Sequence, residues 1–145
     1  NENPNLNVDD GIVGTAYKIK YLNTEYEVTL KEAGFAKSDN PYFDKEYLMA
    51  FFEIKNVGND TDFFNPSIYA EDSEKERYDR TFAAGLSNKY DKTLDYFSQL
   101  NAGQKTSGWI AIERPSGTYS MALYFEYTNP FLSNQPGYIK YTITQ

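Results

Sequence analysis

The chain has 145 residues, of which 21 are acidic and 14 basic, so its net charge at pH 7 is −7 and its length suits one domain with its own core. The acidic balance argues against nucleic-acid binding, because that function requires a basic face. The chain has no His and no Cys, which excludes Ser-His-Asp and Cys-His catalysis, zinc sites of the usual type, iron–sulfur clusters and disulfides.

Residues 1–13 are polar and rich in Asn, a composition typical of a linker. We expect a flexible tether over 1–13 and one domain over 14–145. The sequence shows no signal peptide and no membrane span, and we expect that an exported leader has been removed ahead of the tether.

Apolar and polar residues alternate at period two through most of the remaining chain, which predicts β-strands. The predicted strands lie within residues 16–22, 26–36, 46–60, 61–72, 73–82, 106–114, 118–128 and 138–144. Pro66 interrupts one of them and indicates an edge position or a bulge. The strand that starts at residue 46 is apolar on both faces in its first half, so we expect it to be central. Its faces carry Leu48, Ala50, Phe52 and Ile54 on one side and Tyr47, Met49 and Phe51 on the other.

One segment follows a different period. Leu86, Tyr90, Leu94 and Phe97 recur at helical spacing, which predicts a short helix or 3₁₀ segment in a crossover over 83–100. Seven or eight short strands with one such helical crossover predict an all-β fold, an immunoglobulin-like antiparallel β-sandwich. An up-and-down barrel is the alternative, and the uneven strand spacing favours the sandwich.

Three elements in a fixed order resemble a known family. They are a hydrophobic strand closing on IKN (54–56) before a Gly/Asp turn, the segment YAEDSEKERY (69–78), and LNAGQKTSGWIAIERP (100–115). Together they resemble the immunoglobulin-like lipoprotein domains of unknown function found mainly on the outside of Gram-positive bacteria, which are sometimes labelled telomeric-repeat-binding-factor-like. That family's sandwich is similar to the one in a secreted mycobacterial immunoprotective antigen.

The resemblance covers about residues 14–128. It implies export, often with lipid anchoring through an N-terminal Cys, and it implies no catalytic residue. This chain lacks that Cys, so an anchor would depend on the removed leader. The acidic charge opposes a telomere role.

Trp109 is the only tryptophan, and it alternates with Ile110 and Ile112, which places it on the opposite face of its strand. Two interpretations stay open. Trp109 belongs to the core or lies under the 83–100 crossover, or it is an exposed platform for a sugar or peptide or an interface anchor.

Tyr47, Met49 and Phe51 form a second candidate patch, which Tyr124 joins if its strand is a neighbour. The alternative is that Leu86, Tyr90 and Leu94 of the crossover cover this patch. The candidate ligand-binding residues are therefore Trp109, Tyr47, Phe51 and Tyr124.

The carboxylates suggest two further sites. Asp60 and Asp62 are weak candidates for a calcium site, because their spacing fits no EF-hand loop and Asx residues in turns usually cap their own backbone. An enzyme without His or Cys would have to use carboxylates, Lys, Tyr or Ser. Glu53, Glu113 and Glu126 lie on predicted strands, but a glycosidase needs two carboxylates facing one cleft.

We therefore expect a monomeric, non-enzymatic domain, extracellular or anchored at the cell surface, that binds a protein or glycan. We expect no cofactor and no nucleic acid, and a membrane tether through a removed or lipidated N-terminus. A carboxylate-based glycan hydrolase and a structural spacer without a ligand are the alternatives.

Overall fold

The structure, a computed structural model, describes residues 7–21, 24–40, 42, 45–61, 64–83, 86–95, 99–127 and 137–145. Nine strands and one 3₁₀ turn make up this part of the chain. They are β1 (Asn7–Val8), β2 (Ala16–Tyr21), β3 (Thr24–Lys37), β4 (Glu46–Asn56), β5 (Ser67–Glu71), β6 (Arg77–Thr81), η1 (Asn88–Tyr90), β7 (Lys105–Arg114), β8 (Ser120–Tyr127) and β9 (Gly137–Thr144).

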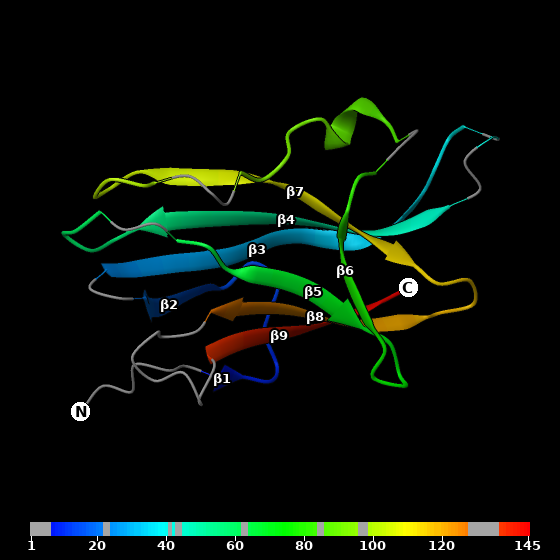
Figure 1. Cartoon of the computed structure of the whole chain (residues 1–145), viewed down its shortest axis with the longest axis horizontal. Coiled ribbons are helices and arrows are strands. Elements are labelled where there is room, and N and C mark those ends of the chain that lie inside the picture. Colours follow the sequence, from blue (N-terminus) through cyan, green and yellow to red (C-terminus); the bar gives the residue numbers. More distant parts are fainter. Residues whose placement is uncertain are drawn as a thin grey trace.

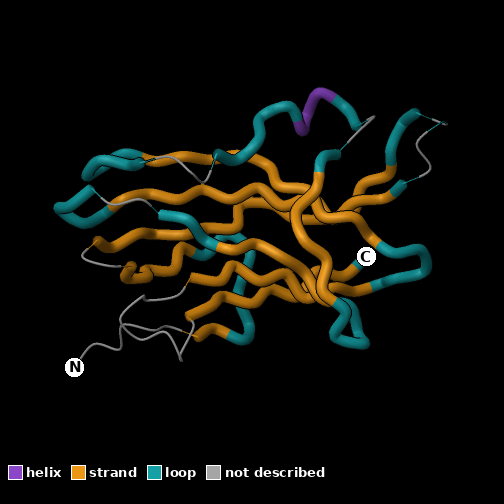
Figure 2. The backbone as a smooth tube through the Cα atoms, in the orientation of Figure 1, coloured by secondary structure: helices purple, strands orange, loops and turns teal. Residues whose placement is uncertain are grey.

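The strands form two packed layers (Figures 1 and 2). One layer runs β1-β9-β8-β5 and the other β7-β4-β3-β2, with β6 between β5 and β7 in the order. β6 runs across the other strands and joins the layers (Figure 1), pairing with β5 through Tyr78 and with β7 through Thr81. The β1–β9 pair is parallel, and the other strand pairs are antiparallel.

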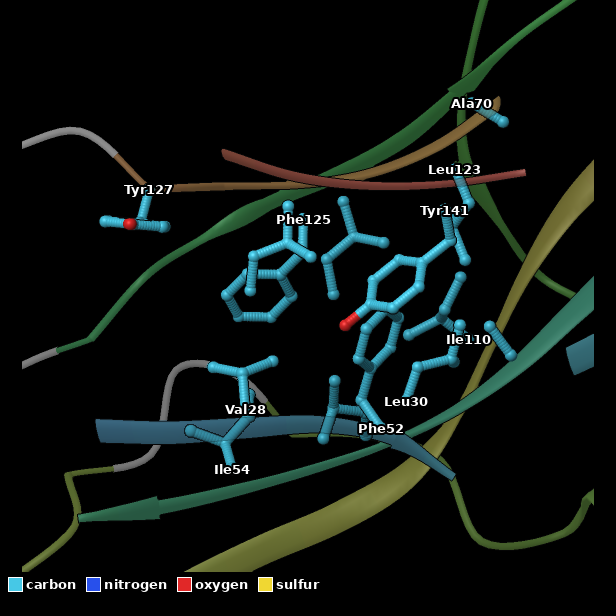
Figure 3. Close-up of a cluster of buried hydrophobic side chains, with 14 of the residues drawn as sticks. Val28, Leu30, Phe52, Ile54, Ala70, Ile110, Leu123, Phe125, Tyr127 and Tyr141 are labelled. Carbon is cyan, nitrogen blue, oxygen red and sulfur yellow. The ribbon is translucent and has the colours of Figure 1, made fainter. Parts of the chain in front are cut away.

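The core lies between the layers and is built by the period-two alternation of the strands. Phe52 of β4 meets Phe125 of β8 with ring centroids 5.3 Å apart, so the two layers touch through their inner faces (Figure 3). The predicted inner face of β4 is confirmed. Its four residues Leu48, Ala50, Phe52 and Ile54 are all buried in this core.

The prediction of seven or eight antiparallel strands is wrong, because β1 is a ninth strand and pairs in parallel with β9. β1 lies within the predicted tether. The amide of Gly11 donates to the carbonyl of Lys140 (2.8 Å) and the hydroxyl of Tyr138 donates to Asp9 (2.7 Å). A polar stretch can add a short edge strand, since the ladder needs only backbone groups. The remaining residues of the predicted tether, 1–6, lie outside the described part.

The predicted helical crossover is also wrong, because within the described residues of 83–100 only Asn88–Tyr90 is helical. This single turn is 3₁₀, the second of the two forms that the spacing predicted. Leu86 and Tyr90 pack on the outside of one layer, whereas Leu94 enters the main core. The chain turns after Tyr90, and Thr93 then forms a parallel bridge with Trp109 of β7, so Leu94 lies on the other side of the sheet from Leu86 and Tyr90. Phe97, the fourth residue of the helical spacing, lies outside the described residues.

Candidate functional site

Trp109 lies on the outer face of β7 and is only 6% exposed. Its ring meets Phe51 of β4 at 5.2 Å and Tyr90 of η1 at 4.7 Å, both nearly perpendicular, an arrangement that aromatic pairs favour. Phe51 is the direct cross-strand partner of Trp109 in the β4–β7 ladder. The indole is therefore covered, as one of the two interpretations held, and it is not an exposed platform.

A second apolar cluster surrounds Trp109 on the outside of this layer, and we call it the outer cluster. It arises because odd-numbered residues of β4 and β7 share one face, and those around the Phe51–Trp109 pair are apolar. Its buried members are Tyr47, Met49, Trp109 and Ala111, and Ala36, Phe51, Ala83, Leu86 and Tyr90 pack against them. The predicted patch is thus covered through Leu86 and Tyr90, but not through Leu94, which lies in the main core.

Residues 86–95, the covering segment, are tied to β7 by backbone hydrogen bonds. The amide of Trp109 donates to the carbonyl of Lys92 (2.7 Å), and the amide of Leu94 donates to the carbonyl of Trp109 (3.0 Å). Gly108 permits this close approach, since a Cβ there would lie 2.5 Å from the nitrogen of Leu94. The covering segment is therefore an extension of the sheet edge as well as a lid of apolar side chains.

An ion pair fixes the same segment to β3. The Nζ of Lys89 donates to the carboxylate of Glu32 at 2.6 Å, with both side chains about half exposed. This bond raises the pKa of Lys89. Lys89 also lies 5.6 Å from the ring centroids of Tyr90 and Trp109. Cation–π interactions of Lys89 with these two rings further stabilise the packing of η1 against the outer cluster.

The covering segment leaves part of the outer cluster open. A pocket of about 380 Å³ lies between this segment and the end of β6, with walls that include Met49, Tyr90, Trp109, Ala83, Phe82 and Arg80. Pockets of this size are typical of small-molecule sites. Phe82 is 91% exposed, so a large apolar side chain stands in water next to the pocket.

Among the described residues of this pocket wall, Arg80 carries a charge. It pairs with Ile112 in the β6–β7 ladder, and its Nη2 donates to the carbonyl of Leu94 at 2.7 Å. Arg80 is not among the site residues predicted from the sequence. No motif marks it, because its place in the wall depends on β6 crossing between the layers and on Leu94 returning to β7.

Tyr124 lies on the outer face of the other layer, on β8. Its ring stacks on Tyr69 at 5.0 Å and meets Tyr138 edge-on at 5.7 Å. Tyr124 therefore does not join Tyr47 and Phe51, because β8 and β4 belong to different layers.

The tyrosines of this second outer face are bonded to carboxylates. Tyr69 donates to Glu126 at 2.9 Å, and burial together with this carboxylate raises the pKa of Tyr69 far above its usual value. Burial, and then the carboxylate of Glu71, raises the pKa of Tyr124. The guanidinium of Arg77 lies 3.9 Å above the ring of Tyr69. The hydroxyls of Tyr69 and Tyr124 therefore interact with carboxylates. Tyr124 and Arg77 already pack against the ring of Tyr69.

The turn after β4 uses its Asx side chains to hold its own backbone. Buried Asn56 accepts from the amide of Gly58 (2.9 Å) and donates to the carbonyls of Asp60 and Leu100 (both 2.8 Å). Asp60 is exposed, and Asp62 lies outside the described residues. Within the part of the chain that the structure describes, no three acidic side chains gather as metal ligands.

The three strand carboxylates lie apart. Glu53 pairs with Ser107 and Glu113 with Tyr47 in the β4–β7 ladder, so about six residues, or roughly 20 Å, separate them along the strands. Glu126 lies on the other layer. Glycoside hydrolysis needs carboxyl groups about 5–10 Å apart, and these three do not provide such a pair.

Residues 12–137 match the family described as "Domain of unknown function (DUF4352)". The chain belongs to this family. The resemblance noted in the sequence is thereby confirmed, and the family has no assigned function. The sequence matches none of the curated proteins.

Solved bacterial structures share the fold of this DUF4352 domain. The secreted protein MPT63 of Mycobacterium tuberculosis is 10% identical, with a TM-score of 0.60 over 92% of this chain and 96% of that one. The yjhA protein of Bacillus subtilis is 16% identical, with a TM-score of 0.62 over 94% and 99%. A candidate lipoprotein of Staphylococcus aureus is 15% identical, with a TM-score of 0.56 over 88% and 92%.

These identities are low, so the likeness establishes the β-sandwich fold alone. Among the described residues, no helix has the length and apolar character needed to cross a membrane.

Proposed function

We propose that this DUF4352 domain is a non-enzymatic binding domain of the bacterial cell exterior and that the pocket beside Trp109 is its ligand site. The observation that carries the proposal is the pocket itself, about 380 Å³ of open space against Trp109, Tyr90 and Met49. Its walls are formed by the sheet and by a segment that is hydrogen-bonded and ion-paired to that sheet. Side chains that are already ordered bind a ligand with a smaller loss of conformational entropy.

The cellular location that we propose for this chain is inferred from proteins with the same fold. MPT63 is a secreted protein and the Staphylococcus aureus relative is a candidate lipoprotein, which supports an extracellular or surface-anchored place for this chain. A tether through a removed or lipidated N-terminus and a monomeric state belong to the same proposal. The ligand is a small group, either free or carried by a protein or glycan at the cell surface.

The two alternative functions are less well supported. The separation of Glu53, Glu113 and Glu126 between strand ends and layers gives a glycan hydrolase no carboxylate pair among these three. A structural spacer needs no pocket, so an aromatic pocket next to exposed Phe82 favours binding over a purely mechanical role.

Trp109 is the only tryptophan of the chain, so tryptophan fluorescence comes from one residue in the wall of the pocket. The probe is N-phenyl-1-naphthylamine, a neutral aromatic dye that accepts excitation energy from tryptophan. We expect saturable energy transfer from Trp109 to the dye, because a bound dye lies against the indole. Absence of saturable transfer at any soluble dye concentration would contradict the proposal and favour the spacer.

A matched pair of variants separates the pocket from the rest of the surface. Ala83→Leu adds a bulky apolar side chain in the pocket wall, and Ala102→Leu makes the same change at an exposed turn before β7. We expect Ala83→Leu to weaken dye binding at least about tenfold and Ala102→Leu to leave it unchanged. Equal binding by both variants would place the dye elsewhere and contradict the assignment of the site.

A further inference from the structure

Strand β3 extends beyond its neighbour β2 and leaves a stretch of sheet edge open. The β2–β3 ladder ends at the pair of Ala16 with Thr29, and the amide of Gly14 then donates to the carbonyl of Leu30 (2.7 Å). Residues 31–37, which we call the free edge, pair with β4 alone among the described strands. Figure 1 shows this part of β3 running past β2 toward the hairpin that it forms with β4.

The backbone groups of Ala33, Phe35 and Lys37 point to the open side of the free edge. Bonded and non-bonded pairs alternate along an antiparallel ladder. The amide of Ser38 donates to the carbonyl of Lys45 (3.0 Å), one position beyond the last pair of the β3–β4 ladder. The bonds to β4 therefore fall on the even-numbered residues of the free edge. The odd-numbered residues direct their N–H and C=O groups away from β4, to a side on which no described strand pairs with them.

The two strands that end the sheet order are protected against further pairing, whereas the free edge is not. β1 has only two residues, and β2 carries Lys18 and Lys20. Short edge strands and lysine side chains are usual ways to prevent a further strand from adding. The centre of the free edge, residues 33–36, reads Ala-Gly-Phe-Ala and has no charge and no proline. An edge of this composition can accept a further strand.

Both sides of the free edge have room for the side chains of such a strand. On the outer side, Gly34 has no atom within 4 Å of its Cβ position, and an aromatic side chain on an adjacent strand can cover an edge glycine. On the inner side, an open pocket of about 440 Å³ lies next to Phe35 and Lys37. The ring of Phe35 packs against the main core and contacts the guanidinium of Arg114 at 4.1 Å. Added side chains therefore meet a glycine on one side and an apolar ring with open space on the other.

The unpaired charges of the free edge are positive. Lys31 and Lys37 flank its uncharged centre, and neither has an ion-pair partner in the described part of the chain. The carboxylates of Glu32 and Glu46 are each paired with a cation already. The next carboxylate along the chain, that of Asp39, lies beyond the strand in the turn of the hairpin. Opposite charges on adjacent strands stabilise their pairing, so this edge favours a strand with acidic ends.

We propose that the free edge of β3 binds an extended peptide segment of another protein as an additional strand. The segment has an aromatic residue opposite Gly34, an apolar residue on either side of it, and acidic residues opposite Lys31 and Lys37. Main-chain hydrogen bonds to the odd-numbered residues of the edge supply affinity, and the side chains supply specificity. This second site does not involve the pocket beside Trp109, so its tests and those of the pocket can fail separately.

The first test uses a synthetic peptide that reads the same in both directions, Glu-Thr-Val-Phe-Val-Thr-Glu, with fluorescein at one end. Fluorescence anisotropy at about 0.15 M salt, which screens distant charges, gives its dissociation constant. We expect saturable binding with a dissociation constant below about 1 mM. A peptide with Lys in place of both Glu residues should bind at least about tenfold more weakly. Absence of saturation, or equal or tighter binding of the Lys peptide, would overturn the inference.

The second test distinguishes strand addition from contact through side chains alone. N-methylation removes an amide donor, and only alternate amides of an added strand face the strand that it joins. One peptide is methylated at the amides of both Val residues and another at the amides of both Thr residues. We expect one of these peptides to lose binding and the other to keep it within about twofold. Equal weakening of both would contradict a strand ladder and overturn the inference.

The third test blocks the edge in the protein. Ala33→Pro removes an N–H group that faces the open side, and the solvent side of an edge strand tolerates proline. Ala16→Pro makes the same change at the first residue of β2. We expect Ala33→Pro to abolish peptide binding and Ala16→Pro to retain it, with circular dichroism showing that both variants fold. Full binding by Ala33→Pro, or equal loss in both folded variants, would refute the assignment to this edge.

A charge-reversed variant tests the same edge without a change in its backbone. Lys31→Glu combined with Lys37→Glu alters two exposed side chains. We expect this variant to bind the Lys peptide about tenfold more tightly than the Glu peptide, the reverse of the wild-type preference. An unchanged preference for the Glu peptide would overturn the inference.

Sedimentation equilibrium of the protein alone tests the other possible occupant, a second copy of this chain. We expect a monomer for both the wild-type protein and Ala33→Pro. A wild-type dimer that Ala33→Pro converts to a monomer would assign the free edge to self-association and overturn the inference.

Discussion

We expect the substitution Gly108→Ala, which adds one methyl group, to separate the covering segment from β7. A Cβ at residue 108 would lie 2.5 Å from the nitrogen of Leu94 and 2.6 Å from the carbonyl oxygen of Thr93. Both are backbone atoms, which cannot rotate away as a flexible side chain does. Gly108→Ala therefore forces the covering segment outward by about 1 Å, the distance needed to reach ordinary van der Waals contact.

The cost can be worked from the contacts at this place. If the segment detaches, two backbone hydrogen bonds between residues 92–94 and Trp109 are lost at about 1 kcal/mol each. The burial of the Leu94 side chain, which is 2% exposed, contributes about 2 kcal/mol more. If the segment stays and the backbone strains, over-packing costs about 1–3 kcal/mol. We expect the free energy of unfolding to fall by about 2–4 kcal/mol.

Urea unfolding followed by far-UV circular dichroism gives the free energy, and the emission of Trp109 gives the local state. We expect the emission maximum of Gly108→Ala to shift to longer wavelength before unfolding, since Tyr90 no longer shields the indole from water. Gly34→Ala is the control. Gly34 also lies in a strand, β3, but has no atom within 4 Å of its Cβ position.

The two glycine variants should behave oppositely. Gly34→Ala restricts the unfolded chain without a clash, so it should be neutral or stabilise by up to about 1 kcal/mol. Wild-type stability and unshifted Trp109 emission in Gly108→Ala would show that the covering segment does not lie against β7. A loss of stability in Gly34→Ala of the same size would show that the effect is general to strand glycines.

Four further outcomes are expected. Asn56→Ala should lower the free energy of unfolding by roughly 1–3 kcal/mol in urea, because it leaves the buried carbonyl of Leu100 without its donor; wild-type stability would contradict this. Tyr141→Phe should not lower the melting temperature, since the buried Tyr141 hydroxyl has no hydrogen-bond partner in the described part of the chain; the backbone of Leu30 approaches that hydroxyl without a well-formed bond. The raised pKa of Tyr69 in the folded protein contributes stability that is fully present below pH 10, the unfolded pKa, and is lost as the pH rises from 10 toward the folded pKa. The melting temperature of Tyr69→Phe should therefore fall less steeply with pH above 10 than that of the wild-type protein. Calcium at millimolar concentration should leave the melting temperature unchanged, and a rise of several degrees would revive the site at Asp60.

Strand faces could be predicted from the sequence because they depend on local geometry. Successive side chains of a strand point to opposite sides, so Ile110 in the core places Trp109 outside it without any knowledge of the neighbours. The same reasoning gave the two faces of β4, and the structure buries both. What alternation leaves open is whether an outer face is covered, since that depends on a segment elsewhere in the chain.

The errors come from non-local contacts. The spacing of Leu86, Tyr90 and Leu94 fits a helix, yet Leu94 turns to the main core because its backbone bonds to Trp109. Tertiary hydrogen bonds here override a period of apolar residues. Tyr124 failed to join Phe51 for a similar reason, since the assignment of strands to layers is set by the path of the chain.

The two outer faces of the sandwich both carry large aromatic side chains, but they accommodate these side chains next to water in different ways. This difference explains the pocket. On the layer of β8, tyrosine hydroxyls bind carboxylates, as in the Tyr69–Glu126 pair, so the face tolerates water. On the layer of β7, the outer cluster is apolar and needs a cover. The cover is interrupted, because β6 ends its pairing with β7 at Thr81 and, within the described part of the chain, the next pairing with β7 is at Thr93. Both of these residues line the pocket, which is the gap between departure and return. A pocket at this place thus follows from one strand crossing between layers, and its aromatic wall from the burial of Trp109.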